Sequence, residues 1–301
     1  LSFSTAARNL FISQSAVSQT ISSIEKELQT QLFVRNSKGV SLTKEGKLLP
    51  YFIAVRNGDK HAIDIVKAGN EKVLEARLAD ALFFYDEDIK KPLESFVENL
   101  KTVVFQAKLG TVYDKTLRIE KLAQDIVETL DEKEILNDTL RAAKLCKADL
   151  VTNMVFEFTE LQGVMGREYA KVGGENDAVA QAIFEHYLPR FAGDILPQTQ
   201  EGVALSIADK LDSMAGFFAI GIQPTGSQDP YALRRQALGV LNIVMDSKLD
   251  ISLKELVELA LNNYSNLEFN KEEVVKSIME FFKERIKNLF RDLGIRYDVI
   301  D

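Results

Sequence analysis

The sequence is poor in the residues that build metal centres and nucleophilic active sites. It contains a single cysteine, Cys146, which cannot form a disulfide within the chain and therefore favours a reducing cytoplasm. Its two histidines, His61 and His186, lie far apart in the sequence, and neither belongs to an HxxxH pair. These shortages make a zinc site, a Ser/His/Asp triad or a Cys/His pair improbable.

Phosphate-binding motifs and membrane spans are also missing. The sequence has no GxxxxGK[ST] and no GxGxxG, so it offers no recognisable cradle for ATP or a dinucleotide. The longest uncharged apolar stretch, Ser213 to Ile222, is far shorter than the roughly 18 residues of a membrane helix. The opening residues lack the basic start and apolar run of a secretory signal. We therefore expect a cytoplasmic protein that contacts no membrane and holds no cofactor itself.

The chain is long, and its charge is distributed unevenly along the sequence. Its 301 residues, 46% of them apolar, are enough for two or three domains. The first fifty residues carry six basic and three acidic side chains, a net charge of +3, which leaves −11 for the remainder. A basic segment on an acidic protein indicates two units with different partners, and the basic one is suited to nucleic acid.

The basic segment contains one amphipathic helical pattern. Its apolar positions Val17, Ile21, Ile24 and Leu28 fall on one helical face, and Ser13 is a candidate N-cap. The opposite face carries short hydroxyl and amide side chains, which suit contacts with bases and phosphates but also suit simple solvation. This face consists of Gln14, Ser15, Ser18, Gln19 and Ser22.

The order of residues in this segment is more specific than the pattern. The strings AAxxLxxSQSAVSxxIxxIExxL and QLFVRNSKGVSLTKEG resemble the winged helix-turn-helix of LysR-type transcriptional regulators. The resemblance implies a partial winged helix-turn-helix over residues 1–49, with the recognition helix over residues 14–22 and the wing near residues 35–38. Gln29 departs from the family, which usually has a glycine there. The DNA-contacting residues implied by the resemblance are Ser13, Gln14, Ser15, Ser18, Gln19, Arg35 and Lys38.

The remainder of the chain has a mainly helical pattern. Apolar residues recur with helical spacing at Leu117, Leu122 and Ile126, and again from Ile278 onward, whereas residues 52–55 form a short strand candidate. The pair Asp229-Pro230 is a helix-start signal, since an N-cap acceptor precedes a proline at the first helical position. We therefore expect a mainly α fold.

From about residue 46 to the end, a second resemblance covers the chain. Strings including GNEKVLEARLADALFFYDED, ELQGVMGREYA, HYLPRFAGD and PTGSQDPYALRRQALG resemble the β subunit of bacterial glycyl-tRNA synthetase. We therefore interpret the chain as a chimera. The resemblance implies a remnant of a preceding region over residues 50–72, an HD-like helical domain over residues 73–247, and the beginning of an anticodon-binding helical domain over residues 248–301.

This resemblance also implies a function. In the family, a separate α subunit binds ATP, with its Mg²⁺, and glycine, while the β subunit engages tRNA. The chain is then expected to be a tRNA-binding fragment of a glycine-tRNA ligase, with the α subunit and tRNA as partners and no catalytic centre of its own. The alternative is a fragment of a LysR-type DNA-binding regulator that contacts DNA through residues 1–49.

The HD-like part resembles metal-dependent phosphohydrolases whose ligands are histidines and aspartates. On that alignment Lys121 and Ala148 stand at histidine positions, and only Asp149 and Asp209 remain. Two carboxylates without imidazoles hold a transition metal poorly, so we expect no metal and no hydrolase chemistry, although a phosphohydrolase is a third hypothesis. Lys121 and Lys147 are predicted either to contact a phosphate or to form a structural salt bridge with Asp149.

The arginine pair Arg234-Arg235 is the other candidate contact with tRNA phosphates. Adjacent residues point about 100° apart on a helix, so one of the two is expected to pair within the protein. His186 is expected to be a hydrogen-bonded packing residue and Met165, Phe217 and Phe218 to lie in the core. The predicted tRNA-binding residues are Arg234, Arg235, Lys121 and Lys147.

Overall fold

The computed structural model describes residues 18–19, 21–22, 25–26, 33–36, 39–42, 62–226 and 228–292. The chain divides into two compact units, residues 1–74 and 75–301. Among the described helices, none combines the length and the apolar character that crossing a bilayer requires.

The described part of the first unit contains a β-hairpin. Strands β1 (Phe33–Asn36) and β2 (Gly39–Leu42) pair antiparallel, with Phe33 opposite Leu42. This hairpin lies where the wing is expected. At Arg35 the structure describes the backbone but not the side chain. Ser18 and Gln19 are helical, Ser18 half-buried and Gln19 exposed. The predictions at Ser13, Gln14, Ser15 and Lys38, and the strand candidate over residues 52–55, lie outside the described residues.

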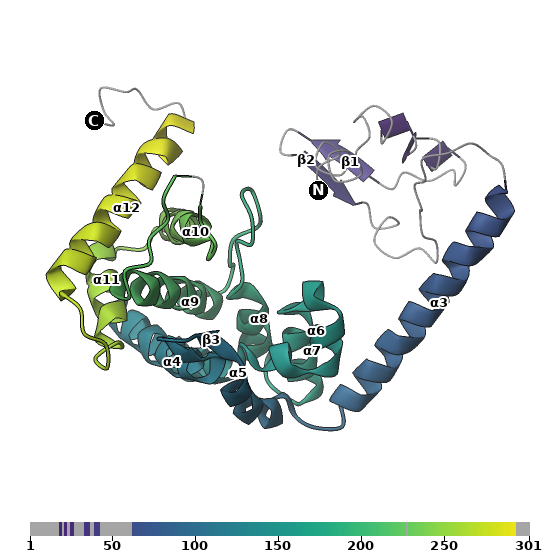
Figure 1. The fold of residues 1–301 in the computed structure, drawn as a ribbon, viewed down its shortest axis with the longest axis horizontal. Coiled ribbons are helices and arrows are strands. Elements are labelled where there is room, and N and C mark those ends of the chain that lie inside the picture. The colour runs from purple at the N-terminus through teal and green to yellow at the C-terminus, as the bar shows by residue number, and fades with distance from the viewer. Residues whose placement is uncertain are drawn as a thin grey trace. The chain divides into compact units, whose positions relative to one another are not determined.

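A long helix, α3 (Ile63–Asp88), runs from the first unit into the second. The remaining elements of the second unit are almost all helical, so the expectation of a mainly α fold is confirmed (Figure 1). They are η1 (Leu93–Thr102), β3 (Val104–Gln106), β4 (Gly110–Thr111), α4 (Val112–Thr129), η2 (Lys133–Ile135), α5 (Leu136–Leu145), η3 (Ala148–Val151), α6 (Asn153–Glu157), η4 (Thr159–Leu161), α7 (Val164–Val172), α8 (Asp177–Glu185), α9 (Gln200–Ala219), α10 (Leu233–Asp246), α11 (Leu253–Asn262) and α12 (Lys271–Asp292).

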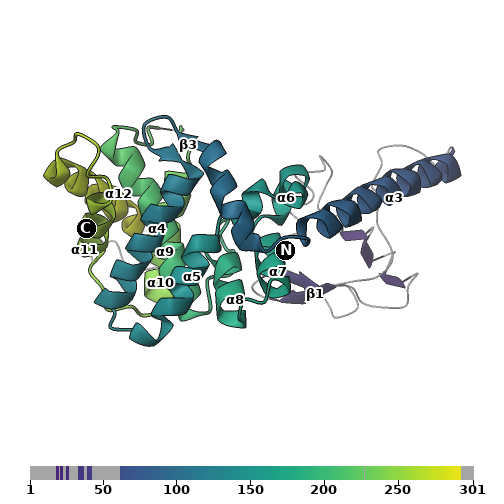
Figure 2. The same ribbon diagram turned by 90° about the horizontal axis from the view of Figure 1, so that it is seen from below.

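Helix α9 is the centre of the second unit. Its residues from Gly202 to Ala219 are buried all round except at Asp209, because α4, α5, α8, α10, α11 and α12 pack against it (Figures 1 and 2). A helix that is buried on nearly every face is stable only when other elements surround it in this way and pair with its charged residues. Met165, Phe217 and Phe218 lie in this core as expected. The core continues into α11 and α12, beyond the predicted boundary at residues 247/248.

Helix α4 shows how local signals position the site. It begins with a capping box in which the Thr111 side chain accepts from the Asp114 backbone N–H and the Asp114 carboxylate accepts from that of Thr111. Its buried stripe contains Ile119, Leu122 and Ile126. Leu117, predicted to belong to this stripe, is 48% exposed, because the five-residue step from Leu117 to Leu122 turns it to the outer face.

Candidate functional site

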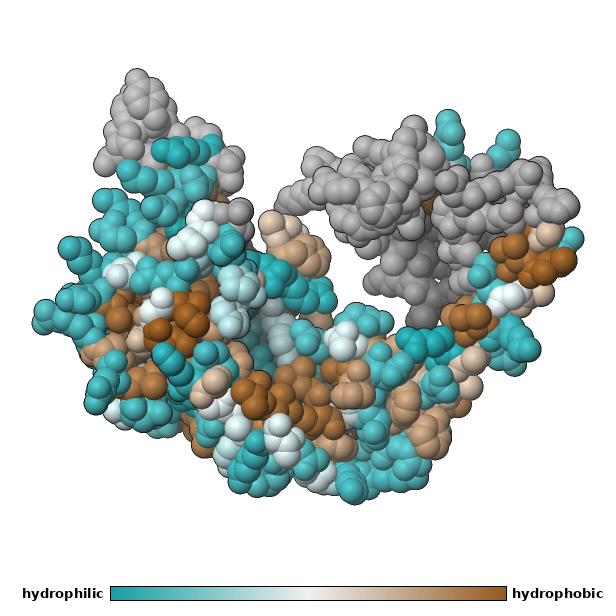
Figure 3. All heavy atoms as spheres, viewed as in Figure 1, coloured by the Kyte–Doolittle hydropathy of each residue, from teal (hydrophilic) through white to brown (hydrophobic). Residues whose placement is uncertain are grey.

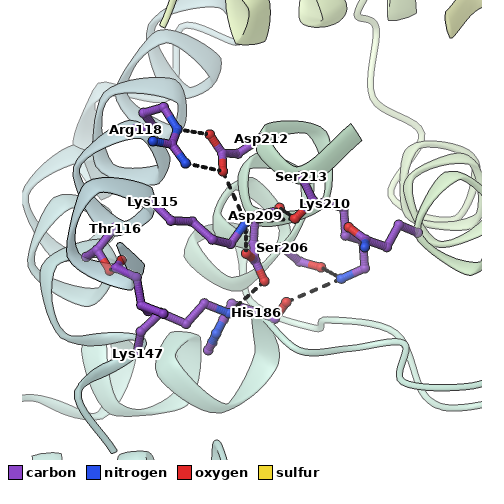
Figure 4. A network of polar contacts seen from close by, with 12 residues as sticks. Lys115, Thr116, Arg118, Lys147, His186, Ser206, Asp209, Lys210, Asp212 and Ser213 are labelled. Atoms are coloured by element: carbon purple, nitrogen blue, oxygen red, sulfur yellow. Dashed lines mark hydrogen bonds and ion pairs between the residues drawn. The ribbon is translucent and has the colours of Figure 1, made fainter. Parts of the chain in front are cut away.

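A cluster of charged side chains lies inside the second unit, around the middle of α9 (Figure 4). Asp209 and Asp212 of α9 meet Lys115 and Arg118 of α4, while Lys147, between α5 and η3, completes the cluster. All five are at most 14% exposed in their side chains, so their charges are compensated by one another rather than by bulk water.

Asp209 is shared by two lysines. The Lys147 Nζ lies 2.8 Å from Oδ2 of Asp209, and the Lys115 Nζ lies 2.9 Å from Oδ1. Burial of Asp209 opposes its ionisation, but the two ammonium groups outweigh this effect and hold the pKa of Asp209 well below its usual value. The Lys115 ammonium also contacts Asp212, at 3.1 Å, and the Ser213 hydroxyl. Asp209 is therefore a buried carboxylate that stays ionised.

Asp212 connects α9 to α4 and to the end of α11. Its Oδ1 accepts from the Arg118 Nε at 2.8 Å and from the Tyr264 hydroxyl at 2.9 Å. The Arg118 guanidinium also lies over the Tyr264 ring, 4.6 Å from its centroid. Neither Lys115 nor Asp212 was identified from the sequence. The signal that could have found them is the presence of charged residues at buried positions of two apolar helical stripes.

The structure corrects the HD-based placement of the two lysines. Lys147 pairs with Asp209 rather than Asp149, and its ammonium lies 4.2 Å from the Tyr187 ring centroid. Lys121 is exposed, and the α4 lysine that enters the cluster is Lys115. Six residues separate Lys115 from Lys121, and at about 100° per residue this puts them on different faces of the helix. The α4 lysine that faces Asp209 is therefore Lys115 rather than Lys121.

Asp149 lies outside the charged cluster and is bonded to the backbone at the start of α7. Its Oδ2 accepts the Gly163 backbone N–H at 2.6 Å, at the start of α7. Within the described part of the chain, its Oδ1 has no hydrogen-bond partner, and no group of three or more His, Cys, Asp or Glu side chains could hold a metal ion. Burial raises the pKa of Asp149 to about 6.

We expect the Asp149→Asn variant to gain stability relative to the wild type as the pH rises from 4 to 7. The folded-state pKa lies above the usual 3.8, so ionisation of Asp149 costs stability once the pH passes through this interval. An amide removes this cost, up to about 3 kcal/mol, while its oxygen still accepts from Gly163. Urea unfolding of both proteins at each pH measures the difference. A difference that is constant with pH would contradict the prediction.

His186 and Lys210 lie beside the charged cluster around the middle of α9 and are also buried. The His186 ring nitrogen Nδ1 contacts the Ile183 carbonyl oxygen, and burial lowers the pKa of the imidazole well below its usual value. Burial likewise lowers the pKa of Lys210 to about 7, and its ammonium donates to the Leu188 carbonyl at 2.6 Å. The expectation that His186 is a hydrogen-bonded packing residue is confirmed.

The arginine pair lies at the start of α10. This helix begins at Leu233, three residues later than the Asp229-Pro230 signal indicated, because Pro230 belongs to the preceding turn. The N-cap residue is Ala232 rather than Asp229, but the Asp229 carboxylate accepts the first backbone N–H groups of the helix, those of Leu233 and Arg234, at 2.8 and 2.9 Å. The Arg234 side chain donates to the Gly226 carbonyl at 2.8 Å, whereas Arg235 is exposed. As expected, one arginine of the two pairs within the protein.

A surface cleft at the start of α9 is lined by more acidic than basic side chains. It has a volume of about 670 Å³ and lies between the start of α9 and the ends of α4 and α10. Glu132, Asp246 and Asp250 are among its lining residues, and Lys248 is the lysine among them. A phosphate would be repelled there, so the α10 start is the better surface for nucleic acid.

The fold and the buried cluster define a class of protein. The second unit is a helical domain whose centre is filled by ion pairs and whose described surface carries an exposed arginine on a capped helix.

Comparisons with known proteins identify the family. The family model of the glycyl-tRNA synthetase β subunit matches residues 20–301, and the chain belongs to this family. It is 70% identical over 278 residues to the glycine-tRNA ligase β subunit of Clostridioides difficile strain 630, covering 92% of this chain and 40% of that protein. It is 56% identical over 264 residues to the same subunit of Desulforamulus reducens, covering 86% of this chain and 38% of that protein.

The chain thus spans about two fifths of the length of these relatives. The match begins at residue 20, inside the segment that resembles the LysR-type winged helix, rather than at residue 46. The comparisons therefore give no support to a fusion with a LysR-type regulator.

Proposed function

We propose that this chain is a tRNA-binding part of the β subunit of a glycine-tRNA ligase, acting in the cytoplasm with a separate α subunit that supplies the active site, ATP and Mg²⁺. The proposal is supported by membership of the family and by the 70% identity with a protein of that name. It agrees with the buried cluster, in which each carboxylate that could serve in hydrolysis is bonded to a cation or a backbone amide.

The observation that carries the tRNA contact is the difference between the two arginines of α10. Arg234 is held by the Gly226 carbonyl, while Arg235 is exposed, and in the described part of the structure its guanidinium has no bonding partner. A free guanidinium can form two parallel hydrogen bonds with a phosphate. Lys147 is buried against Asp209, so it is a weaker candidate for a tRNA contact than Arg235. Lys121 is exposed and is a further candidate for such a contact.

The test is tRNA binding by Arg235→Ala and Arg234→Ala. Loss of one phosphate contact is expected to weaken binding several-fold for all tRNA sequences and to lower the slope of log affinity against log salt by about one. We expect this result for Arg235→Ala, a smaller change for Arg234→Ala, and none for Lys133→Ala, whose exposed ammonium pairs with Asp131. An Arg235→Ala protein with the wild-type affinity and salt slope would refute the contact.

Two other functions are tested in the same preparation. A DNA-binding role for residues 1–49 predicts that the chain binds duplex DNA without displacing tRNA, and the hairpin of β1 and β2 is the observation that favours it. Weak, salt-sensitive binding without sequence preference is expected from a net charge of +3 in residues 1–50. A phosphohydrolase predicts hydrolysis of nucleotides with Mn²⁺ or Mg²⁺ that Asp149→Ala abolishes, and we expect none.

A further inference from the structure

Two arginines and two phenylalanines alternate along one edge of the second unit. The Arg167 guanidinium of α7 lies over the Phe184 ring of α8, 4.9 Å from its centroid. The Arg190 guanidinium lies 5.9 Å from the Phe184 centroid and 5.7 Å from the Phe191 centroid. We call these four residues the Arg–Phe ladder. Phe191 ends it with a ring that is 56% exposed.

The loop that carries Phe191, residues 188–197, is held in place by the protein. Its base is fixed by the Leu188 carbonyl, which accepts from the Ser206 hydroxyl and from the Lys210 ammonium, each at 2.6 Å. Its turn is closed by Asp194, which accepts from the Arg190 backbone N–H at 2.9 Å and from its Nε at 2.8 Å. The backbone that carries the exposed ring is therefore fixed before any partner arrives, which reduces the entropy lost on binding.

The loop projects from the surface between α8 and α10 in Figure 1, and its place in Figure 3 carries apolar residues. Phe191 and Ile195 are the large apolar side chains exposed on it, at 56% and 60%. The exposed aromatic tip of this fixed loop is available for contact with a partner.

The surroundings of the loop favour a nucleic acid. A Cβ at Gly239 of α10, one helical turn after Arg235, would lie 2.9 Å from Cε of Lys210 and 3.5 Å from Cδ of Pro189, so α10 packs against the base of the loop. The loop with the exposed ring therefore starts beside the helix that presents the free guanidinium of Arg235, whereas Arg167 and Arg190 of the Arg–Phe ladder are paired with Glu168 and Asp194. Aromatic rings flanked by arginines are the platform on which unpaired bases stack, while the cations contact the backbone.

We propose that an unpaired base of the bound tRNA stacks on Phe191 and extends the Arg–Phe ladder by one ring, while Arg235 contacts a nearby phosphate. This inference rests on the proposed function and names the residue that reads an unpaired region. A flat π-system continues an alternating stack of guanidinium and phenyl groups, whereas an aliphatic side chain of a protein partner would only cover it.

The experiment uses glycine tRNA transcripts with the fluorescent base 2-aminopurine at one unpaired position, in the 3′ end or in the anticodon loop. Binding of the full chain is expected to quench one of the two reporters by stacking. Phe191→Ala and Phe191→Leu should weaken binding about tenfold and remove that quenching, whereas Phe191→Trp should preserve both. The control is Phe156→Ala, which removes a ring that is 80% exposed on α6 and lies outside the Arg–Phe ladder.

The outcomes separate the inference from the proposed function. If the wild-type chain binds no tRNA, both fail. If it binds tRNA and Phe191→Ala and Phe191→Leu bind equally well with unchanged quenching, stacking on Phe191 is overturned while the proposed function stands. If Phe191→Ala weakens binding but Phe191→Leu does not, the contact is apolar packing rather than stacking, and the inference is again wrong. Circular dichroism of each variant establishes that it is folded.

Discussion

The Asp209→Asn variant is expected to lose about 3–5 kcal/mol of its free energy of unfolding. The substitution keeps the shape of the side chain but removes the negative charge that faces Lys147 at 2.8 Å and Lys115 at 2.9 Å. Lys115 keeps Asp212 as a partner, whereas Lys147 is 6% exposed in its side chain and loses its bonded carboxylate. A buried ammonium without a counter-charge carries most of this cost. Urea unfolding followed by circular dichroism measures it.

A double variant separates the charge effect from a loss of packing. In Lys147→Met/Asp209→Asn the unpaired ammonium is gone as well, so this protein should be more stable than Asp209→Asn alone. The matched surface control is Glu98→Gln, which removes the partner of Lys101 in a pair that is more than half exposed on both sides. Its effect should be much smaller than that of Asp209→Asn, because water screens an exposed pair. A double variant no more stable than Asp209→Asn would show that the charge of Lys147 is not the cause.

Replacing Gly216 by alanine is expected to destabilise the second unit by about 2–4 kcal/mol. A Cβ at this position would lie 2.8 Å from Cζ of Tyr264 and 3.0 Å from a Leu109 methyl carbon, and closer still to the Tyr264 hydroxyl. Tyr264 is 1% exposed, and its hydroxyl donates to Asp212, so the ring has little room to move. The cost combines overpacking with a weakened hydrogen bond to a buried carboxylate.

Two further variants test this explanation. Tyr264→Phe removes the hydroxyl that the new methyl group would meet, so Gly216→Ala/Tyr264→Phe should cost less than the sum of the two single variants. Gly69→Ala is the control, because a Cβ there meets no atom within 4 Å and the residue lies inside α3, where alanine is the better helix former. It should be neutral or stabilising. Additive costs for the first pair would contradict the steric account.

The position of Lys115 shows what sequence patterns miss. On α4 the pattern of apolar residues predicts a helix, and the helix is found at Val112–Thr129. The pattern places Lys115 on the apolar stripe, four residues before Ile119, and Lys121 beside it, but it does not say what compensates a buried ammonium. The compensation comes from the carboxylates of α9, almost a hundred residues later in the chain, which pair with Lys115.

The sequence by itself determined the mainly helical fold, the family, the absence of phosphate-cradle motifs, and the role of Asp229 as an acceptor at the start of α10, because each depends on residues that are close together in the chain. Only the tertiary structure decided that Lys147 pairs with Asp209, that Arg235 rather than Arg234 is free, and that Arg167, Phe184, Arg190 and Phe191 form one ladder. These relations join side chains from different helices and loops, and their distances are set by the packing around α9, which no local periodicity encodes.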